Sequence, residues 1–356
     1  MSRFIQLHIL TSYPPSNLNR DDTGRPKTAV IGDCTRLRIS SQSLKRAWRT
    51  SDIFESALKG HIGIRTKEMG INIYQSLTKQ GVNEKNAREW AKAIASQFGK
   101  LKSDKKAENN EDLHVEQLVH FSPEEEKAIA DLVTQLVASA AAPTEDNLKL
   151  LRKQHTAVDI AMFGRMLASS PSFNTEAAIQ VAHAITVHKA AIEDDYFIAV
   201  DDLNTGEEDK GAAHIGELGF GAGVFYLYIC IDRELLQANL GGDAELTQKT
   251  LTAFVQAVTK VSPTGKQNSF ASRAYAGFVL AEKGDQQPRS LAQAFLKPIK
   301  PNPEKGEDTM TRAIKELTKR RDNFNTVYGD CADISTQFNI ETGEGSLSAI
   351  AAFIAE

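Results

Sequence analysis

The chain has 356 residues and an apolar fraction of 41%. This composition is that of an ordinary globular protein and excludes a disordered or collagen-like chain, and the length predicts two domains or one domain with large insertions. The formal net charge is −4, but residues 1–49 carry nine Lys or Arg against three Asp, a net of +6, so the remaining residues carry −10. A basic block on an acidic body predicts a local site for a polyanion, and a solvated charged face is the alternative.

The first elements follow from the hydrophobic pattern of residues 1–58. A strand is predicted over 3–11, a long loop over 12–33, a short extended segment over 36–39, and a helix from Ser40 or Ser41 to about residue 58. Residues 60–153 are predicted to be mostly helical. The later predicted strands are 155–162, 178–188, 224–231 and 274–281. The other predicted helices are 84–98, one that begins at Ser122, 243–261, 308–328 and 346–355.

The order of these elements predicts an α+β fold. Strand, helix, two strands, helix and strand follow one another as in a ferredoxin-like, or RRM-like, split βαβ unit. The helical region 60–153 is then an insertion between the first helix and the second strand, and a smaller insertion separates the second and third strands.

The cysteines and the apolar runs indicate the environment of the protein. Cys34, Cys230 and Cys331 are widely separated and form no CxxC pair, which argues against a zinc site. No apolar run approaches the ~18 residues of a membrane span, and the segment 4–10 lacks the features of a signal peptide. We therefore expect a cytoplasmic protein that has no contact with a membrane and no cofactor or metal.

The segment 36–49 is the strongest candidate for binding chemistry. A helix N-terminus offers unpaired backbone N–H groups and the positive end of the helix dipole, and the amide of Gln42 adds a neutral donor. Lys45 and Arg49 are four residues apart and share one helix face, whereas Arg46 lies on an adjacent face. Such a helix is suited to follow a phosphate backbone rather than to distinguish bases. An ordinary Ser-capped amphipathic helix is the alternative.

Three other motifs have both a functional and a simpler structural interpretation. Asp21 and Asp22 are adjacent, as in some metal sites, but without a His or Glu partner at defined spacing a structural role is favoured. Met166, after Gly164 and Arg165, could contact a nucleobase or fill the core. The segment 264–267 (TGKQ) lacks the first Gly and the Ser/Thr of a phosphate-binding P-loop.

Several segments, taken together, resemble a known family. They are Asn19–Asp22, Arg38–Ala47, Val158–Met166, Ala182–Thr186, Ala199–Leu203, Ala213–His214 and Gly223–Tyr226. Their order and sequence are similar to those of the CasC family, the guide-RNA (crRNA) backbone subunits of the type I-E CRISPR complex Cascade. The motifs extend over residues 1 to about 280, and the region 60–153 and the C-terminal 70 residues match only loosely.

The resemblance implies a hand-like architecture and a filament. The implied parts are a palm of 1–58, 155–189 and 223–356 (the last including C-terminal helices), helical fingers over 59–154 and a thumb hairpin over 190–222. Several copies would stack along the guide spacer, and each thumb would kink the nucleic acid of its neighbour. The lysine-rich fingers helix that family members can use against duplex DNA is reduced here to Lys149, Arg152 and Lys153.

The resemblance also implies the binding residues. The RNA contacts would be Arg20, Lys27, Arg38, Ser40, Gln42, Lys45, Arg46, Arg49, Arg165 and Met166. The wedge at the kinked position would include Phe197, Ile198 and Leu203 on the thumb.

The implied function is that of a non-catalytic scaffold in antiviral defence. Its partners would be crRNA, the target DNA strand that pairs with the guide, further copies of the chain, and other Cascade subunits. Two alternatives remain open. One is a metal-dependent endoribonuclease that uses the loop aspartates Asp21, Asp22 and Asp33, and the other is an RNA-binding protein that acts alone outside CRISPR complexes.

Overall fold

The computed structural model describes residues 2–103, 108–199 and 214–356, which fold as two compact units. The first unit comprises residues 1–54, 180–232 and 251–356, and the second comprises residues 55–179 and 233–250. Both contain helices and strands, so the predicted α+β class is confirmed. In the described part of the chain, no helix is long and apolar enough to cross a membrane.

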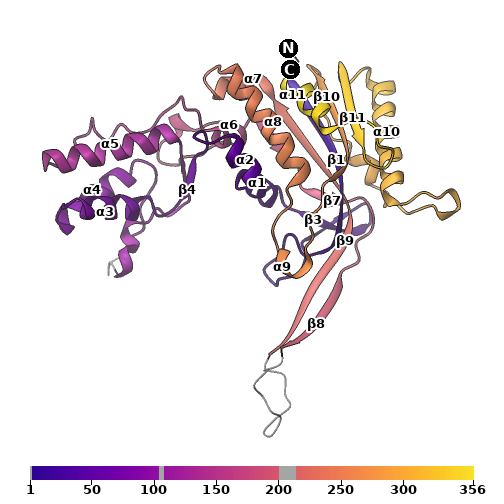
Figure 1. Cartoon of the computed structure of the whole chain (residues 1–356), viewed down its shortest axis with the longest axis horizontal. Coiled ribbons are helices and arrows are strands. Elements are labelled where there is room, and N and C mark those ends of the chain that lie inside the picture. The colour runs from indigo at the N-terminus through magenta and orange to yellow at the C-terminus, as the bar shows by residue number, and fades with distance from the viewer. Residues whose placement is uncertain (1, 104–107, 200–213) are drawn as a thin grey trace, which may run out of the picture. The chain divides into compact units, whose positions relative to one another are not determined.

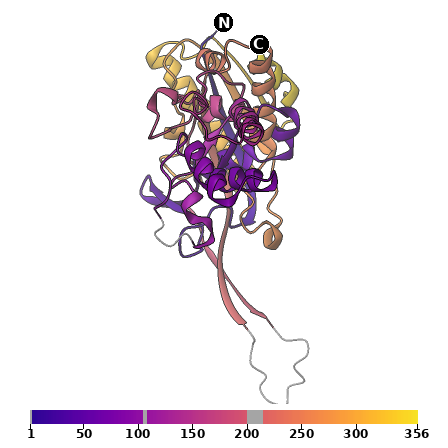
Figure 2. The same ribbon diagram turned by 90° about the vertical axis from the view of Figure 1, so that its left-hand side faces the viewer.

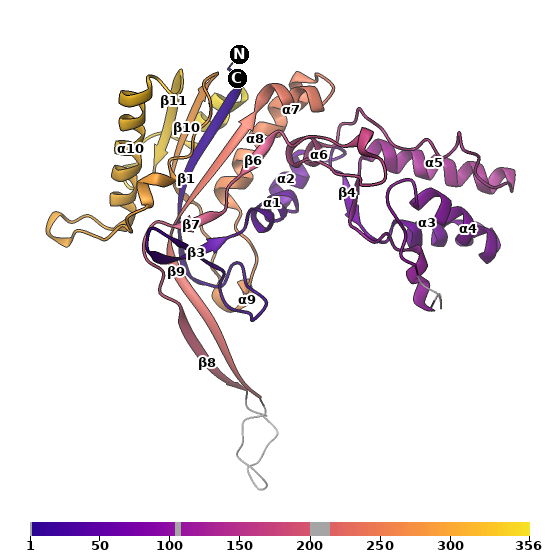
Figure 3. The same cartoon turned by 180° about the vertical axis from the view of Figure 1, so that it is seen from behind.

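A nine-stranded sheet, counted over the described residues, lies at the centre of the first unit (Figure 1). The order of its main path is β11 (Ile334–Asn339), β10 (Ala276–Gly284), β1 (Phe4–Ser16), β9 (His214–Asp232), β7 (Ala184–Thr186), β3 (Cys34–Ile39) and β2 (Thr28–Ile31). Two further strands, β6 (Ile179–Val181) and β8 (Glu193–Ala199), pair with β9. The view from behind shows β1 between β10 and β9 (Figure 3), and β1 is antiparallel to both.

The central strand β1 is buried on both faces. Leu10 packs with Tyr226 of β9 and Phe278 of β10 in an apolar cluster that also contains side chains of the segment 291–299 and of α10 (Thr309–Tyr328). Ile5, Leu7 and Ile9 point to the opposite face, because successive residues of a strand alternate, and they are at most 1% exposed. Neither face of the sheet is therefore open to solvent between Ile5 and Leu10 of this strand.

The predicted helix over 41–58 is two helices, α1 (Ser41–Arg49) and α2 (Asp52–Ala57). The break occurs because the hydroxyl of Ser51 accepts a hydrogen bond from the backbone N–H of Phe54 at 3.3 Å and so caps the second helix. Trp48 of α1 makes an edge-to-face contact with Phe254 of α8 (Ala244–Lys260), with ring centroids 5.6 Å apart.

Two hairpins extend from the sheet. In the first, Ile31 pairs with Cys34, and Gly32 and Asp33 adopt φ values of 57° and 62°, which is the geometry of a two-residue type I′ turn. In the second, β8 pairs with the N-terminal part of β9 and projects as a narrow ribbon (Figure 2). The short helix α9 (Gln267–Phe270) and the C-terminal α11 (Leu347–Ala355) complete the described helices of this unit, with 3₁₀ turns at Ala292–Phe295 and Pro303–Lys305.

The second unit is mainly helical. Its elements are β4 (Ile64–Thr66), α3 (Met69–Lys79), α4 (Glu84–Ala95), β5 (Val119–Phe121), α5 (Pro123–Ser139), α6 (Val158–Phe163) and α7 (Arg233–Asn239), with 3₁₀ turns at Glu108–Leu113 and Pro171–Phe173. A core that includes Trp90, Ile94, Phe98, Leu113 and Leu132 holds the helices together. The predicted start of a helix at Ser122 is confirmed, because Ser122 and Glu125 form a reciprocal capping box.

Some predicted elements differ from the structure. The strand predicted over 155–162 is wrong, because the apolar run is the helix α6, and a short apolar run has no period that distinguishes the two. The predicted strand 178–188 is two short strands, β6 and β7. Strand β11, at the edge of the sheet, was not predicted. The helices predicted over 84–98, 243–261, 308–328 and 346–355 are confirmed, with small shifts at their ends.

A buried polar network crosses the sheet beneath the segment 285–291. His8 Nε2 lies 3.2 Å from Glu282 Oε2, and Arg289 Nη1 donates to the same oxygen at 2.7 Å. Tyr226 Oη lies 2.9 Å from His8 Nδ1 and accepts a hydrogen bond from Leu291 N at 3.0 Å. Burial alone would raise the pKa of Glu282, but the hydrogen bonds from His8 and Arg289 outweigh it and lower this pKa to about 2.

This network predicts a pH-dependent contribution to stability. The pKa of Glu282 is lower in the folded protein than in the unfolded chain, so the stabilisation is complete above about pH 5 and is lost as the pH falls towards 2. Glu282→Gln should cost about 3–5 kcal/mol at pH 7, because Arg289 remains buried without its carboxylate. Urea denaturation midpoints at pH 7 and pH 3 measure both effects. The exposed Glu341→Gln serves as control, and equal midpoints for the two variants at pH 7 would contradict the prediction.

Candidate nucleic-acid interface

The first turn of α1 is held by its own cap residue, Ser40, and by the loop after β1. Ser40 caps the helix, and its hydroxyl accepts from Ser43 N at 3.4 Å. The backbone N–H of Ser40 donates to Asn19 Oδ1 at 2.8 Å, which ties the loop after β1 to the start of the helix. Leu44 and Trp48 are buried on one side of α1. Ser40 itself is 7% exposed, so the position predicted as an RNA contact acts here as a helix cap.

The loop 17–27 has a defined internal structure. Asn17 Nδ2 donates to the carbonyl oxygens of Gly24 at 2.9 Å and Gly219 at 2.8 Å. Asp21 Oδ1 accepts from Thr23 Oγ1 at 2.7 Å, from Thr23 N at 2.9 Å and from Arg25 N at 3.0 Å. The hydrogen bond from the Thr23 hydroxyl is the main cause of a lowered pKa for Asp21. The carboxylate of Asp21 therefore organises the loop.

A second group of cations lies where this loop meets β3. Lys27 N donates to Asn19 O at 2.9 Å, and Arg38 N donates to Lys27 O at 2.8 Å. The guanidinium of Arg38 lies 2.7 Å from His183 Nδ1. Burial, followed by the charges of Arg38 and Lys27, lowers the pKa of His183, so this histidine is neutral and accepts the hydrogen bond. The charges of the predicted residues Lys27 and Arg38 therefore both act on His183.

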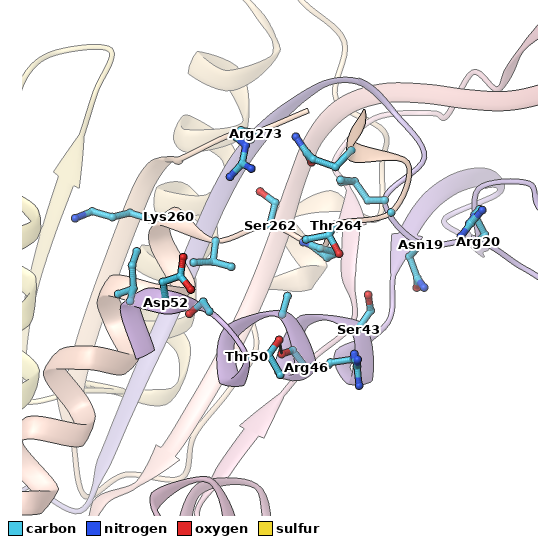
Figure 4. Close-up of a pocket in the computed structure, with 18 of the residues that line it drawn as sticks. Asn19, Arg20, Ser43, Arg46, Thr50, Asp52, Lys260, Ser262, Thr264 and Arg273 are labelled. Carbon is cyan, nitrogen blue, oxygen red and sulfur yellow. Dashed lines mark hydrogen bonds between the residues drawn. The ribbon is translucent and has the colours of Figure 1, made fainter. Parts of the chain in front are cut away.

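The loop, α1 and a distant segment enclose an open cavity of about 870 Å³ (Figure 4). Asn19, Arg20 and Asp22 line it from the loop. Ser43, Arg46 and Thr50 line it from α1, where Figure 4 shows them along one helix face. The opposite wall is the segment 260–275, which includes Lys260, Ser262, Thr264, Arg273 and Tyr275. We call this cavity the α1 groove.

Three arginines contribute exposed guanidinium groups to the α1 groove. Arg20, Arg46 and Arg273 are exposed, and none of the ion pairs found in the described ranges includes any of them. Lys260 adds a fourth cation, and its Nζ lies 2.6 Å from Gln256 Oε1. Asp21, Asp22 and Asp52 also line the groove, and Asp21 is already held by its own loop. An exposed guanidinium offers planar, paired donors that match a phosphate.

The groove wall 260–275 was missed in the sequence analysis. The segment 264–267 was compared only with a P-loop, and the isolated Lys260, Arg273 and Tyr275 form no motif along the chain. Tyr275 is 68% exposed, so a large aromatic ring stands at a polar groove, as in sites where bases stack on protein. No local signal marks Tyr275 as exposed, because strand β10, which follows it, is buried throughout and shows no alternation.

The cations of α1 do not all face the α1 groove. Lys45 and Arg49 are absent from its lining residues, because each residue turns the helix by about 100° and places them on the other side of the buried stripe. Both are partly buried, and burial lowers the pKa of Lys45. Gln42 is exposed on the same side. The predicted separation of Arg46 from Lys45 and Arg49 is confirmed.

Arg165 is a correction. It was expected to hold an RNA phosphate, but its side chain is 1% exposed and forms a 2.6 Å ion pair with Glu125, which is fully buried. Its Nη1 and Nη2 also donate to the carbonyl oxygens of His120, Arg152 and Phe173, and its Nε is buried with no hydrogen-bond partner among the described residues. A guanidinium enclosed in this way is not available to a phosphate. Its neighbour Met166 is 82% exposed, which excludes the core-filling alternative.

The hairpin residues divide between two faces. Phe197 and Ile198 are consecutive in β8 and therefore point to opposite sides of the hairpin, so they cannot form one wedge as expected. The ring of Phe197 lies over Gly216, its partner across the hairpin, where a Cβ atom would approach the ring to 2.3 Å. Ile198 is 52% exposed. Leu203, the third expected wedge residue, lies outside the described residues.

The loop aspartates do not form a cluster with metal-site geometry. In the residues that the structure describes, no group of three or more His, Cys, Asp or Glu side chains is placed to hold a metal ion. Asp21 and Asp22 line the α1 groove, whereas Asp33 belongs to the turn between β2 and β3.

Comparisons with known proteins agree with this architecture. A family model described as CT1975-like protein matches residues 5–352. The chain is similar to a chain of a CRISPR RNA-guided surveillance complex in a pre-nicking state, with a TM-score of 0.86 and 28% identity over 99% of both chains. A chain of another CRISPR RNA-guided surveillance complex gives a TM-score of 0.74 and 24% identity, also over 99% of both chains, and shows the fold alone. No match is found among curated proteins. The resemblance inferred from the sequence motifs is confirmed.

The α1 groove gives a prediction for single-stranded RNA. Arg46→Ala/Arg273→Ala removes one cation from each wall, so the log–log salt slope of binding should become less steep by about 1.4 and the affinity at low salt should fall about tenfold. Fluorescence anisotropy at several salt concentrations measures both. Lys305→Ala/Lys319→Ala changes two exposed lysines outside the groove and should leave the slope nearly unchanged. Equal slopes for the two double variants would exclude the groove as a phosphate site.

Proposed function

The chain belongs to the CT1975-like protein family, and from this premise we propose that it is the guide-RNA-binding backbone subunit of a type I-E CRISPR surveillance complex. The first unit is then an RRM-like palm with the β8–β9 hairpin as its thumb, and the second unit supplies the helical fingers. Several copies stack along the guide RNA in the cytoplasm, contact other subunits, and present the guide bases to a target DNA strand. The protein holds the backbone while base pairing determines sequence.

The observation that carries this proposal is the set of exposed arginines in the α1 groove. The chain has more acidic than basic residues, and Arg3, Arg25 and Arg88 all pair with carboxylates. Arg20, Arg46 and Arg273 come from distant parts of the sequence and meet in one concavity, and the carboxylates of the described residues form no ion pair with them. Exposed guanidinium groups that converge on a concave surface offer paired donors to the phosphates of a polyanion.

The sheet supports recognition by loops rather than by stacking on the sheet face. An RRM that binds RNA on its sheet displays aromatic rings there. In this chain Tyr226 is 2% exposed and packs against Phe295, with ring centroids 5.1 Å apart. The segment 291–299 therefore occupies the surface on which bases would stack. Contacts from α1 and the adjacent loops address phosphates and tolerate any guide sequence.

The arrangement of the loop supports a scaffold over an endoribonuclease. Asp21 Oδ1 accepts three hydrogen bonds from its own loop, and this committed oxygen is a poor candidate for a metal ligand or a base. Asp33 does not line the groove that holds Asp21 and Asp22. We propose that none of these residues is catalytic.

Binding to RNAs of increasing length tests the proposal directly. A backbone subunit should bind unrelated sequences in steps as the RNA lengthens, because each added segment accommodates another copy. If about six cations per copy contact phosphates, the log–log salt slope should be about −4 per copy. Lys45→Ala/Arg49→Ala should weaken every step and reduce the slope by about 1.4. Native mass spectrometry gives the number of copies, and anisotropy gives the slope.

The same experiment separates the alternatives. Magnesium is included and the RNA is examined for cleavage, with Asp21→Ala/Asp22→Ala beside the wild type. Cleavage that is lost in this variant would favour the endoribonuclease. Tight binding of a single copy to one defined sequence would favour an RNA-binding protein that acts alone. Absence of binding at any length would refute the proposal, and Lys305→Ala/Lys319→Ala controls for the removal of positive charge in general.

A further inference from the structure

Met166 is an exposed apolar side chain on a firmly held turn. It is 82% exposed, whereas Arg165 and Leu167 on either side are 5% and 2% exposed. Arg165 and Thr175 exchange two backbone hydrogen bonds at 3.0 and 2.9 Å, and Leu167 N donates to Asn174 Oδ1 at 2.6 Å. These contacts fix the backbone on both sides of Met166, so its direction is determined although its side chain contacts little.

The turn is secured from below by the buried guanidinium of Arg165. Its Nη1 lies 2.6 Å from Glu125 Oε2, and its Nη2 donates to Phe173 O at 3.1 Å and Arg152 O at 3.2 Å. Phe173 ends the 3₁₀ turn Pro171–Phe173, just before Asn174 and Thr175. The guanidinium therefore connects both ends of the turn to the body of the second unit.

Glu125 joins three chain segments through one carboxylate. Besides Arg165, its Oε2 accepts from Ser122 N at 2.9 Å, and its Oε1 accepts from Arg152 N at 2.8 Å. Both oxygens act as acceptors, so an amide in place of the carboxylate would direct its NH₂ group at one of these donors. A buried ion pair adds little net stability compared with apolar packing, but it imposes a defined geometry.

We infer that Glu125 and Arg165 are positioning residues, and that their ion pair holds Met166 in place as a rigid contact for the face of an unstacked nucleobase. The inference rests on the proposed function, which supplies the nucleic acid. One methionine among the small residues Ala168 and Ser169 is too small an apolar patch to dock a protein. The apolar surface of one methionine side chain is similar in size to one face of a single base, and a thioether makes favourable contacts with aromatic rings.

The test uses RNA with one 2-aminopurine, whose fluorescence rises when the base is unstacked, moved along the sequence in separate oligonucleotides. The full-length wild type should show enhanced fluorescence at particular positions, and Met166→Ala should lose it. Glu125→Gln and Arg165→Met should lose most of the same enhancement although Met166 is present. Their affinity and salt slope should stay close to those of the wild type, because neither residue contacts phosphate.

Two further variants separate positioning from general destabilisation. Ser122→Ala removes the hydroxyl of the capping box but leaves the ion pair, so it should retain the enhancement. Asn174→Ala changes an exposed residue and removes only the hydrogen bond to Leu167 N, so it should fold normally and show a partial loss. This variant keeps the test decisive if Glu125→Gln does not fold, and circular dichroism establishes folding for each protein.

The opposing outcomes are distinct. If Arg165 instead holds a phosphate, Arg165→Met reduces the salt slope by about 0.7, and Glu125→Gln binds RNA at least as well as the wild type with its enhancement intact. That result would overturn the inference and leave the proposed function standing. Normal RNA binding with fluorescence that does not depend on Met166 would also overturn it. Failure of the wild type to bind RNA would overturn both.

Discussion

The pairing of β1 with two long neighbours is the constraint on which the first unit depends. Because β1 lies between β9 and β10 and is buried on both faces, the sheet has no free surface there for a ligand. The His8–Glu282–Arg289 network and Phe295 seal the side on which an RRM would stack bases. Binding chemistry is therefore displaced to the place where strands end. The loop that leaves β1 at Ser16 meets the segment that enters β10 at Ala276, and α1 lies beside both.

The loop after β1 converts this topology into a site. Asn17 and Asn19 use side-chain amides to tie it to Gly219 and Ser40, and Asp21 organises its tip. These hydrogen bonds hold the loop without involving the guanidinium of Arg20, which is exposed at the groove. Helix α1 is likewise held by uncharged residues, because Ser40 caps it and Leu44 and Trp48 pack in the core. Its cations lie on two sides, with Arg46 exposed towards the groove and Lys45 and Arg49 partly buried on the side away from it.

The sequence predicted what depends on local chemistry and missed what depends on the tertiary fold. Helix starts at Ser40 or Ser41 and at Ser122 were predicted because a cap acts over three residues, but the first helix was expected to continue to about residue 58 and ends at Arg49. Helix α6 was mistaken for a strand because a short apolar run has no distinguishing period. The wall formed by Lys260, Arg273 and Tyr275 could not be predicted, since these residues meet Arg20 only after β1 and β10 pair. Arg165 was assigned by resemblance, and only burial against Glu125 showed its different position.

Two classes of arginine in this chain differ in their availability to a ligand, and burial distinguishes them better than sequence does. Arg36 and Arg165 are buried, and all of their contacts shown here are to protein carbonyl oxygens or to a carboxylate. Removing a buried guanidinium's partner leaves an uncompensated charge, so these side chains define geometry and cannot also serve a ligand. Arg20, Arg46 and Arg273 are exposed and form no ion pair within the part of the chain that the structure describes, so their charge can act on a ligand and its effect is screened by salt. A backbone-binding scaffold needs both classes. Exposed arginines supply affinity that is independent of sequence, and buried ones keep a side chain such as Met166 in a fixed place.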